Sequence, residues 1–177
     1  MVERDGTPEL SEGIRDAPGA DASGLVYRLA RESDADALVG FNRAMASETE
    51  SLELPVETIT AGVRNLLRTL QYGFYVVAEH ADGEGAREAV GSLMVTYEWS
   101  DWRDGLFWWI QSVYVRPEFR RRGVYRRLYE FVKQLAAREP NVRGFRLYVE
   151  RENRVAQSTY ERLGMRRSHY LMYEETL

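Results

Sequence analysis

The chain of 177 residues contains no cysteine and a single lysine, Lys133, among its 24 basic residues. Without cysteine it can form no disulfide, no thiolate zinc site and no Cys-based acyl intermediate. No apolar run approaches the roughly 18 residues that a membrane span needs, and the N-terminus lacks the basic and apolar regions of a secretory signal. The two histidines, His80 and His169, are isolated, so we expect no metal. These absences predict a cytoplasmic protein that has no membrane contact.

Acidic residues exceed basic ones, and the net charge of −4 argues against general affinity for nucleic acid. The arginines are nevertheless concentrated around Gly123, at a predicted helix start. The cluster consists of Arg116, Arg120, Arg121, Arg122, Arg126 and Arg127. A local basic site in an acidic protein indicates a small anionic ligand. A nucleic-acid-binding domain that uses this cluster is an alternative, which the net charge disfavours.

The apolar pattern predicts one α/β domain over residues 25–177, after an acidic arm at residues 1–24 that we expect to be mobile. Strands are expected at 25–30, 74–79, 89–99, 106–115, 145–150 and 165–174, and helices are expected to start near Ser33, Pro55, Gly123 and Asn153. The order is βααβββαβαβ. Apolar residues occur on both faces of the central strands, and Trp108 and Trp109 are adjacent. This pattern predicts a central mixed sheet with helices on both faces and both tryptophans in the core.

The segment from Val113 to Tyr125 reads as a strand, a short loop and the start of a helix. A helix N-terminus leaves four backbone N–H groups without intrahelical partners and carries about half a positive charge. A pyrophosphate can accept hydrogen bonds from these groups where no side chain blocks its approach, which Gly123 allows. The flanking arginines can pair with phosphates. The structural alternative is a glycine required only for loop conformation, with solvated arginines around it.

This stretch resembles motif A of the GNAT acetyltransferases, Q/R-x-x-G-x-G/A, with Arg120 at the first position and Gly123 at the central one. Tyr125 departs from the motif, because Gly or Ala is usual there, so its ring must point away from the phosphates or narrow their site. The resemblance implies acetyl-CoA (coenzyme A) as the cofactor. The residues that it places at the cofactor are Val113, Tyr114, Val115, Arg120, Arg121, Arg122, Gly123, Val124 and Tyr125.

A second segment resembles motif B of the same family, N-x-x-A-x-x-x-Y-x-x-x-G-F/M, which is matched by Asn153, Ala156, Tyr160, Gly164 and Met165. The two motifs together span about a third of the chain, residues 107–165. The resemblance implies that Asn153, Ala156 and Tyr160 lie at the cofactor, with Tyr160 beside its sulfur as general acid. A phenol has a pKa near 10 and a thiol near 8.5, so full proton transfer is uphill by about 2 kcal/mol. We therefore expect Tyr160 to stabilise the leaving thiolate through a strong hydrogen bond.

A primary amine must lose a proton before it attacks a thioester, and a carboxylate can remove that proton through water. Many GNAT relatives place Glu on the strand before motif A, where this chain has Gln111, which cannot act as a base. By resemblance, the residues at the acceptor cleft are Glu48, Glu50, Glu98, Trp99, Asp101 and Trp102. Glu50 and Glu98 are the candidate catalytic bases, and the tryptophans could form an aromatic wall for a cationic or aromatic amine. Each of these groups could instead be a solvated carboxylate or a ring that packs in a loop.

The resemblance predicts an N-acetyltransferase, an acyltransferase that moves the acetyl group of acetyl-CoA to a primary amine of a small molecule or a peptide. Because no cysteine can carry the acyl group, we expect direct attack in a ternary complex. The alternative is a non-catalytic acyl-CoA-binding or protein-interaction module with a GNAT fold, which Gln111 and Tyr125 leave open. Residues 48–50 and 99–103 resemble segments of an uncharacterised bacterial GNAT subfamily, and a homodimer is common in the family.

Overall fold

The computed structural model describes residues 19–20, 24–81 and 86–176. The chain forms two compact units, Met1–Leu147 and Tyr148–Leu177, which are described separately. The first unit contains a six-stranded sheet whose strands are neighbours in chain order. Its strands are β1 (Gly19–Ala20), β2 (Leu25–Leu29), β3 (Gly73–Ala81), β4 (Arg87–Ser100), β5 (Gly105–Val115) and β6 (Val142–Arg146). Its helices are α1 (Ala35–Glu50), α2 (Val56–Arg68) and α3 (Val124–Ala136), and the second unit contains α4 (Arg154–Arg162).

The sheet is mixed, because β1 to β5 pair antiparallel and β5 pairs parallel with β6. The β5–β6 pairing covers only Leu106–Trp109 of β5. On that side, none of the strands that the structure describes pairs with the second half of β5, residues 110–115. Between the pairs that join Leu93 to Val113 and Val95 to Ile110, β5 has one more residue than β4, which is a β-bulge. This second half of β5, which pairs with β4 on its other side, leads directly into the arginine-rich loop.

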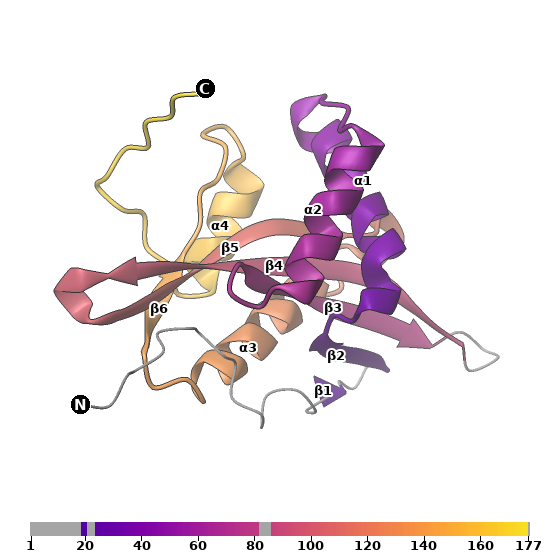
Figure 1. The fold of residues 1–177 in the computed structure, drawn as a ribbon, viewed down its shortest axis with the longest axis horizontal. Helices are drawn as coiled ribbons and strands as arrows, with labels where there is room; N and C mark the ends of the chain where they lie inside the picture. The colour runs from indigo at the N-terminus through magenta and orange to yellow at the C-terminus, as the bar shows by residue number, and fades with distance from the viewer. Residues whose placement is uncertain (1–18, 21–23, 82–85, 177) are drawn as a thin grey trace. The chain divides into compact units, whose positions relative to one another are not determined.

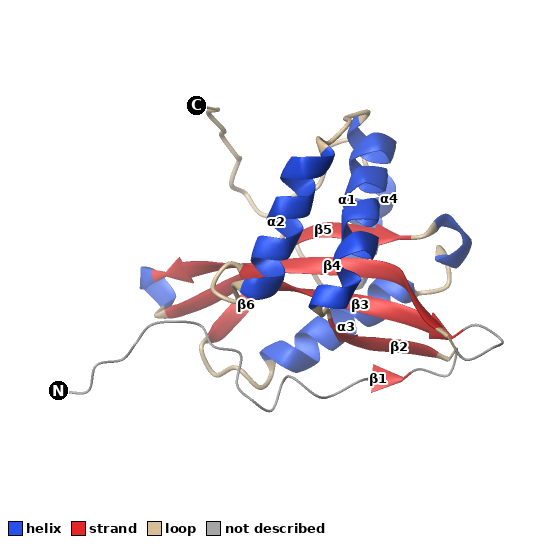
Figure 2. Cartoon of the chain, turned by 45° about the vertical axis from the view of Figure 1, so that its right-hand side comes forward, coloured by secondary structure: helices blue, strands red, loops and turns tan. Residues whose placement is uncertain are grey.

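Helices cover both faces of the sheet: α1 and α2 lie over one face and α3 over the other (Figures 1 and 2). On the first face, Tyr75 and Val77 of β3 pack with a cluster from the two helices, namely Ala35, Leu38, Phe41, Val63 and Leu66. On the second face, Phe145 of β6 contacts two aromatic rings edge-on, Trp108 of β5 and Tyr129 of α3. Trp108 is almost fully buried, as predicted. The predicted fold class, a mixed α/β sheet with helices on both faces, is confirmed.

The segment between α1 and α2 begins with a sharp change of direction. Ser51 has a φ of +53°, the left-handed conformation that usually favours glycine after a helix. The N–H of Leu52 donates to the carbonyl of Ala46 at 3.1 Å, which closes the end of α1. Pro55 then stands at the N-cap of α2, directly before the first helical residue, Val56. The exposed segment between them is therefore fixed at both ends.

A largely buried ionic network ties β2 to β3 and to the start of α1. Arg28 donates to both carboxylate oxygens of Asp34, at 2.7 and 2.9 Å, and also to Glu79. Asp34 accepts a further bond from the N–H of Arg31 at 2.6 Å. Burial acts to raise the pKa of Asp34, but the hydrogen bonds from Arg28 and Arg31 outweigh it and hold this pKa below its usual value. The network therefore depends on an ionised Asp34.

The second unit contains one helix and no strand among residues 148–176. Asn153 caps α4, because its side chain accepts the N–H of Ala156 at 3.0 Å, and Gly164 follows the helix with a φ of +93°. Both helix signals are confirmed. The strand predicted at 165–174 is wrong. A strand requires a neighbour for its backbone hydrogen bonds, and the described part of this unit offers no other strand.

The N-terminal region also differs from the predicted order. β1 pairs with β2 from within the predicted arm, through Gly19–Tyr27 and Ala20–Val26. Most of residues 1–24 lie outside the described residues, so the mobile arm and the domain boundary at residue 25 stay predictions. The observed order is ββααβββαβα rather than βααβββαβαβ. Among the described helices, none combines the length and the apolar character that crossing a membrane requires.

Candidate cofactor and acceptor site

The candidate cofactor loop joins β5 to α3. After a 3-10 turn at Pro117–Phe119, the chain passes through Arg121 and Gly123 with φ angles of +62° and +80°, and Gly123 is the N-cap of α3. The N–H of Arg127 donates to the carbonyl of Gly123 at 3.1 Å as the first intrahelical bond. The N–H groups before it have no acceptor within the helix. A Cβ added at Gly123 would meet no atom within 4 Å, so the loop surface is open at this point.

Four of the six clustered arginines are paired with carboxylates. The pairs are Arg116 with Glu88 and Glu118, Arg120 with Glu48, and Arg126 and Arg127 with Glu130. Arg121 and Arg122 are exposed and form no ion pair with any residue that the structure describes. The guanidinium of Arg122 lies 5.5 Å from the ring centre of Phe119. The two arginines without a carboxylate partner among the described residues therefore directly precede Gly123, at the positive end of α3.

The first side chains of α3 are used in packing. Val124 is buried, and Tyr125 stacks on Tyr129 one turn further along the helix, with ring centres 6.3 Å apart and ring planes 3° apart. These positions could offer backbone N–H groups to a ligand while their side chains support the helix. The other predicted cofactor residues before the loop, Val113, Tyr114 and Val115, are half-buried at the end of β5.

Arg120 is held by three contacts at the end of β5. Its Nε donates to the Val115 carbonyl at 2.8 Å, its Nη2 donates to Glu48 at 2.6 Å, and its guanidinium lies 5.3 Å from the ring centre of Tyr114. The hydroxyl of Tyr114 donates to the other oxygen of Glu48 at 3.0 Å, and its ring stacks on Phe41. The hydrogen bond from Arg120 lowers the pKa of Glu48. Glu48, in the last turn of α1, thus contacts the candidate cofactor loop.

Glu98 lies on the same face of the sheet as α1 and α2, because it is four residues from Met94, which packs against the cluster under these helices. Its carboxylate accepts hydrogen bonds from the indole N–H of Trp109 and from Arg146. Next to it, Gln111 donates to the hydroxyl of Thr96 at 3.1 Å. Trp109 is half-buried rather than part of the core, because its polar N–H binds a carboxylate at the sheet surface.

The other acceptor candidates do not join Glu98. Trp99 is 63% exposed and follows Glu98 directly on β4, so the two side chains point to opposite faces. Asp101 accepts the backbone N–H of Trp102 at 2.8 Å within the hairpin turn, where Trp102 is 85% exposed. Glu50, the last residue of α1, is exposed and forms no ion pair or hydrogen bond with a described residue. The structure therefore does not assemble the predicted aromatic wall around these carboxylates.

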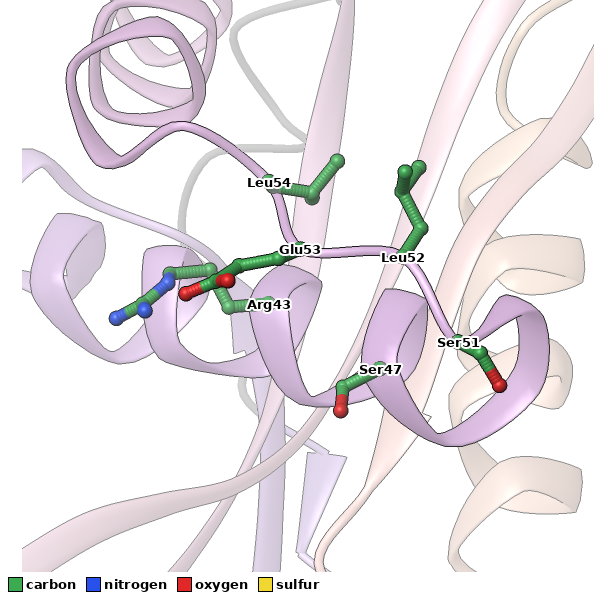
Figure 3. A pocket seen from close by; sticks show the side chains of 6 residues that line it. All are labelled: Arg43, Ser47, Ser51, Leu52, Glu53 and Leu54. Atoms are coloured by element: carbon green, nitrogen blue, oxygen red, sulfur yellow. The ribbon is translucent and has the colours of Figure 1, made fainter.

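A pocket that the sequence did not predict lies at the end of α1 (Figure 3). It has a volume of about 410 Å³ and is lined by Arg43, Ser47, Ser51, Leu52, Glu53 and Leu54. Arg43 and Ser47 come from α1, four residues apart and so on one face, and the others come from its end and the following segment. The pocket offers a cation, a carboxylate, hydroxyls and apolar surface to a small molecule. Its formation depends on the turn at Ser51, which no local motif indicates.

In the second unit, two residues of the second motif, Ala156 and Tyr160, lie on α4, and the others lie at or beyond its ends. Ala156 and Tyr160 are four residues apart on one face of this helix, and both are half-buried. Asn153 uses its side chain as the helix cap. Burial raises the pKa of the Tyr160 phenol. The phenol is therefore a protonated hydrogen-bond donor at neutral pH and a weaker acid than free tyrosine.

Residues 27–165 match the model of the acetyltransferase (GNAT) family. The chain belongs to this family. The family binds acetyl-CoA and carries out acetyl transfer, so the chain is assigned to the acyltransferases at this level. Comparison with curated proteins finds no match.

Solved structures of other GNAT-fold proteins resemble this chain over most of its length. A possible acetyltransferase from Clostridium difficile 630 is 43% identical, with 86% of this chain and 97% of that chain covered and a TM-score of 0.79. The aminoglycoside N-acetyltransferase AAC(6')-Iy, in complex with CoA, is 16% identical, with coverages of 91% and 97% and a TM-score of 0.69. The integron cassette protein HFX_CASS3 from the Cole Harbour Salt Marsh metagenome is 23% identical, with coverages of 85% and 90% and a TM-score of 0.71. The last two share the fold with this chain.

This GNAT chain therefore carries three groups of candidate residues. The first is the open N-terminus of α3 with Arg121 and Arg122, the second is Glu98 with its donors on the sheet, and the third is Tyr160 on α4. No group of three His, Asp or Glu side chains in the described ranges could hold a metal ion.

Proposed function

We propose that this GNAT protein is an N-acetyltransferase that transfers the acetyl group of acetyl-CoA to a primary amine of a small molecule or a peptide. The observation that carries the proposal is the open N-terminus of α3. Gly123 leaves the loop surface uncovered, and Arg121 and Arg122 lack a carboxylate partner among the described residues. Backbone N–H groups at a helix N-terminus suit a pyrophosphate, and guanidinium groups suit phosphates. The edge of β5 at residues 113–115, which pairs with no described strand on the side of β6, suits the amides of the pantetheine arm.

In the proposed reaction, the neutral amine attacks the thioester carbonyl in a ternary complex. A C–N bond forms, the C–S bond breaks, and CoA leaves as a thiolate that accepts a hydrogen bond from Tyr160. A carboxylate accepts the proton that the nitrogen loses as the C–N bond forms, directly or through water. Glu98 is favoured over Glu50 for this step, because Trp109 and Arg146 fix its orientation. Glu50 has no partner among the described residues that would position it.

The proposal is tested by release of the CoA thiol in the presence of acetyl-CoA and a panel of primary amines. The panel contains polyamines, amino acids, peptides with a free N-terminus and aminoglycosides, the last because AAC(6')-Iy shares the fold. We expect at least one amine to raise thiol release well above acetyl-CoA hydrolysis and to gain one acetyl group by mass spectrometry. Background release with every amine would contradict an enzymatic function.

Two substitutions test the assigned roles once an acceptor is known. Tyr160→Phe should lower kcat by about 10-fold to 100-fold, because it removes the donor to the thiolate, with the Kd for acetyl-CoA unchanged. Glu98→Gln should lower kcat/KM by about 100-fold. An unchanged kcat in Tyr160→Phe would remove this residue from the mechanism. A larger loss in Glu50→Gln than in Glu98→Gln would move the base to α1.

The second candidate function is a non-catalytic acyl-CoA-binding or protein-interaction module. It is favoured by Gln111, which stands where many relatives carry Glu and whose amide donates to Thr96. This alternative predicts saturable acetyl-CoA binding in calorimetric titration, together with background thiol release for every amine of the same panel. The cytoplasmic location and the homodimer stay predictions from the sequence.

A further inference from the structure

Arg120 differs in its surroundings from the two arginines that follow it. Its Nε and Nη2 donate to the Val115 carbonyl and to Glu48, so this edge of the guanidinium faces the end of β5 and the end of α1. Arg121 and Arg122 have no carboxylate partner among the described residues. A guanidinium offers its donors in a rigid fork, so donors that already bind the protein cannot also bind a phosphate.

Glu48 connects this arginine to the core. Its two carboxylate oxygens accept hydrogen bonds from two different groups, the guanidinium of Arg120 and the hydroxyl of Tyr114. The ring of Tyr114 stacks on Phe41 of α1 at 5.3 Å, and Phe41 belongs to the buried cluster between α1, α2 and the sheet. The loop before α3 is thus joined to a rigid helix through one carboxylate.

The loop requires such a restraint. Arg121 has a φ of +62°, a conformation that residues with a side chain adopt only at an energetic cost. Arg120 comes directly before it and is the loop residue with the most contacts to β5 and α1. Restraining Arg120 limits the conformations available to Arg121, and so keeps the open arrangement that ends at Gly123.

We infer that Glu48 is a positioning residue for the cofactor: it holds Arg120 against β5, which fixes the loop in the open form that receives the phosphates of acetyl-CoA. Arg120 shapes the loop, and Arg121 with Arg122 contact the phosphates. This inference rests on the proposed function. It gives Glu48 a role at the cofactor instead of the predicted role at the acceptor, and it gives Arg120 a structural role in place of direct phosphate binding.

Whether acetyl-CoA affinity falls or rises in Glu48→Gln tests the inference. If Glu48 positions Arg120, Glu48→Gln should weaken acetyl-CoA binding by about fivefold in isothermal titration calorimetry. If Glu48 only competed with phosphate for Arg120, the same variant would bind equally or more tightly, which would overturn the inference. Glu57→Gln is the matched control, because Glu57 is an exposed carboxylate on α2 without a partner among the described residues, and its affinity should equal that of wild type.

A double-mutant cycle separates positioning from a general change of charge. The family motif accepts Gln at the position of Arg120, so Arg120→Gln should still bind acetyl-CoA. In that background Glu48→Gln should change the affinity by less than about 1.5-fold, because the contact has already been removed. A fivefold loss that persists in the Arg120→Gln background would overturn the inference.

Hydrogen exchange of the free protein examines the contact without any ligand. Glu48→Gln should speed exchange of the amides at residues 118–124 relative to wild type and Glu57→Gln. Unchanged exchange would overturn the inference even if the affinity falls. If wild type binds no acetyl-CoA, the proposed function and the cofactor role of Glu48 both fail, whereas the exchange result still shows separately whether Glu48 orders the loop.

Discussion

Two arginine–carboxylate networks in the first unit use the same chemistry at different depths. Arg28, Asp34 and Glu79 have side chains that are 14%, 10% and 12% exposed, whereas Arg120 and Glu48 are 42% and 40% exposed. A buried charge that loses its partner is strongly destabilising, whereas an exposed pair contributes little to stability. The comparison indicates that the buried network holds the fold together and that the exposed pair serves the local position of a loop.

The largest effect is expected from Arg28→Met, which leaves two largely buried carboxylates, Asp34 and Glu79, without this cation. It should lower the free energy of unfolding by about 3 to 5 kcal/mol, measured by urea denaturation. Arg68→Met is the matched control, because Arg68 pairs with Glu32 at the surface, and it should have a far smaller effect. Equal losses in the two variants would mean that burial does not distinguish these networks.

Acid should destabilise the buried network selectively. The folded pKa of Asp34 lies below its usual value, so ionised Asp34 stabilises the protein above about pH 4, the unfolded pKa, and this contribution is lost as pH falls through the folded pKa. In Asp34→Asn, the free energy of unfolding should therefore fall less steeply than in wild type as the pH is lowered below about 5. Urea denaturation at a series of pH values measures it. A decline as steep as that of wild type would show that Asp34 does not set the acid sensitivity.

The exposed pair should affect ligand binding more than stability. Glu48→Gln should change the free energy of unfolding by no more than about 0.5 kcal/mol, while it weakens acetyl-CoA binding. Urea denaturation of the variant without ligand provides the stability. If the free energy of unfolding fell as much as in Arg28→Met, both networks would stabilise the fold equally, and the difference drawn between them would be wrong.

The smallest effect is expected from Tyr114→Phe. This change removes the hydrogen bond to Glu48 but keeps the ring on Phe41 and beneath Arg120. We expect acetyl-CoA affinity to fall by about twofold and stability to change by less than about 0.5 kcal/mol. Calorimetric titration and urea denaturation measure the two quantities. A larger loss than in Glu48→Gln would mean that the tyrosine, and not the carboxylate, orders the loop.

The parts of the molecule that sequence predicted correctly depend on local signals. The helix N-caps Gly123 and Asn153 could be predicted because each depends on one residue. Gly123 adopts a positive φ, and Asn153 supplies a capping side chain. The structure has no strand at 165–174 and has β1, which was not predicted. Whether a segment forms a strand depends on a neighbouring strand to pair with, and the local apolar pattern carries no information about that neighbour. Trp109 was misplaced in the core for a similar reason, because its carboxylate partner lies on the neighbouring strand.

The least predictable feature was the contact between Glu48 and Arg120, which are 72 residues apart. Each residue alone matched a different expectation, an acceptor carboxylate and a phosphate-binding arginine. Only the packing of α1 on the sheet, through Phe41 and Tyr114, brings them together. The pocket beside Arg43 and Ser47 likewise depends on the direction that the chain takes after Ser51.

The central claim is that acetyl-CoA binds at the open N-terminus of α3, and thermal unfolding with and without acetyl-CoA tests it directly. At about 100 times the Kd, the ligand should stabilise wild type by roughly 2.7 kcal/mol, a rise in Tm of about 5 to 10 °C for a chain of this length. Gly24→Glu controls for strain, because Gly24 has a similar φ of +78° and equally open surroundings. The account predicts a full shift in wild type and Gly24→Glu and none in folded Gly123→Glu. No shift in wild type, or an equal shift in Gly123→Glu, would contradict it.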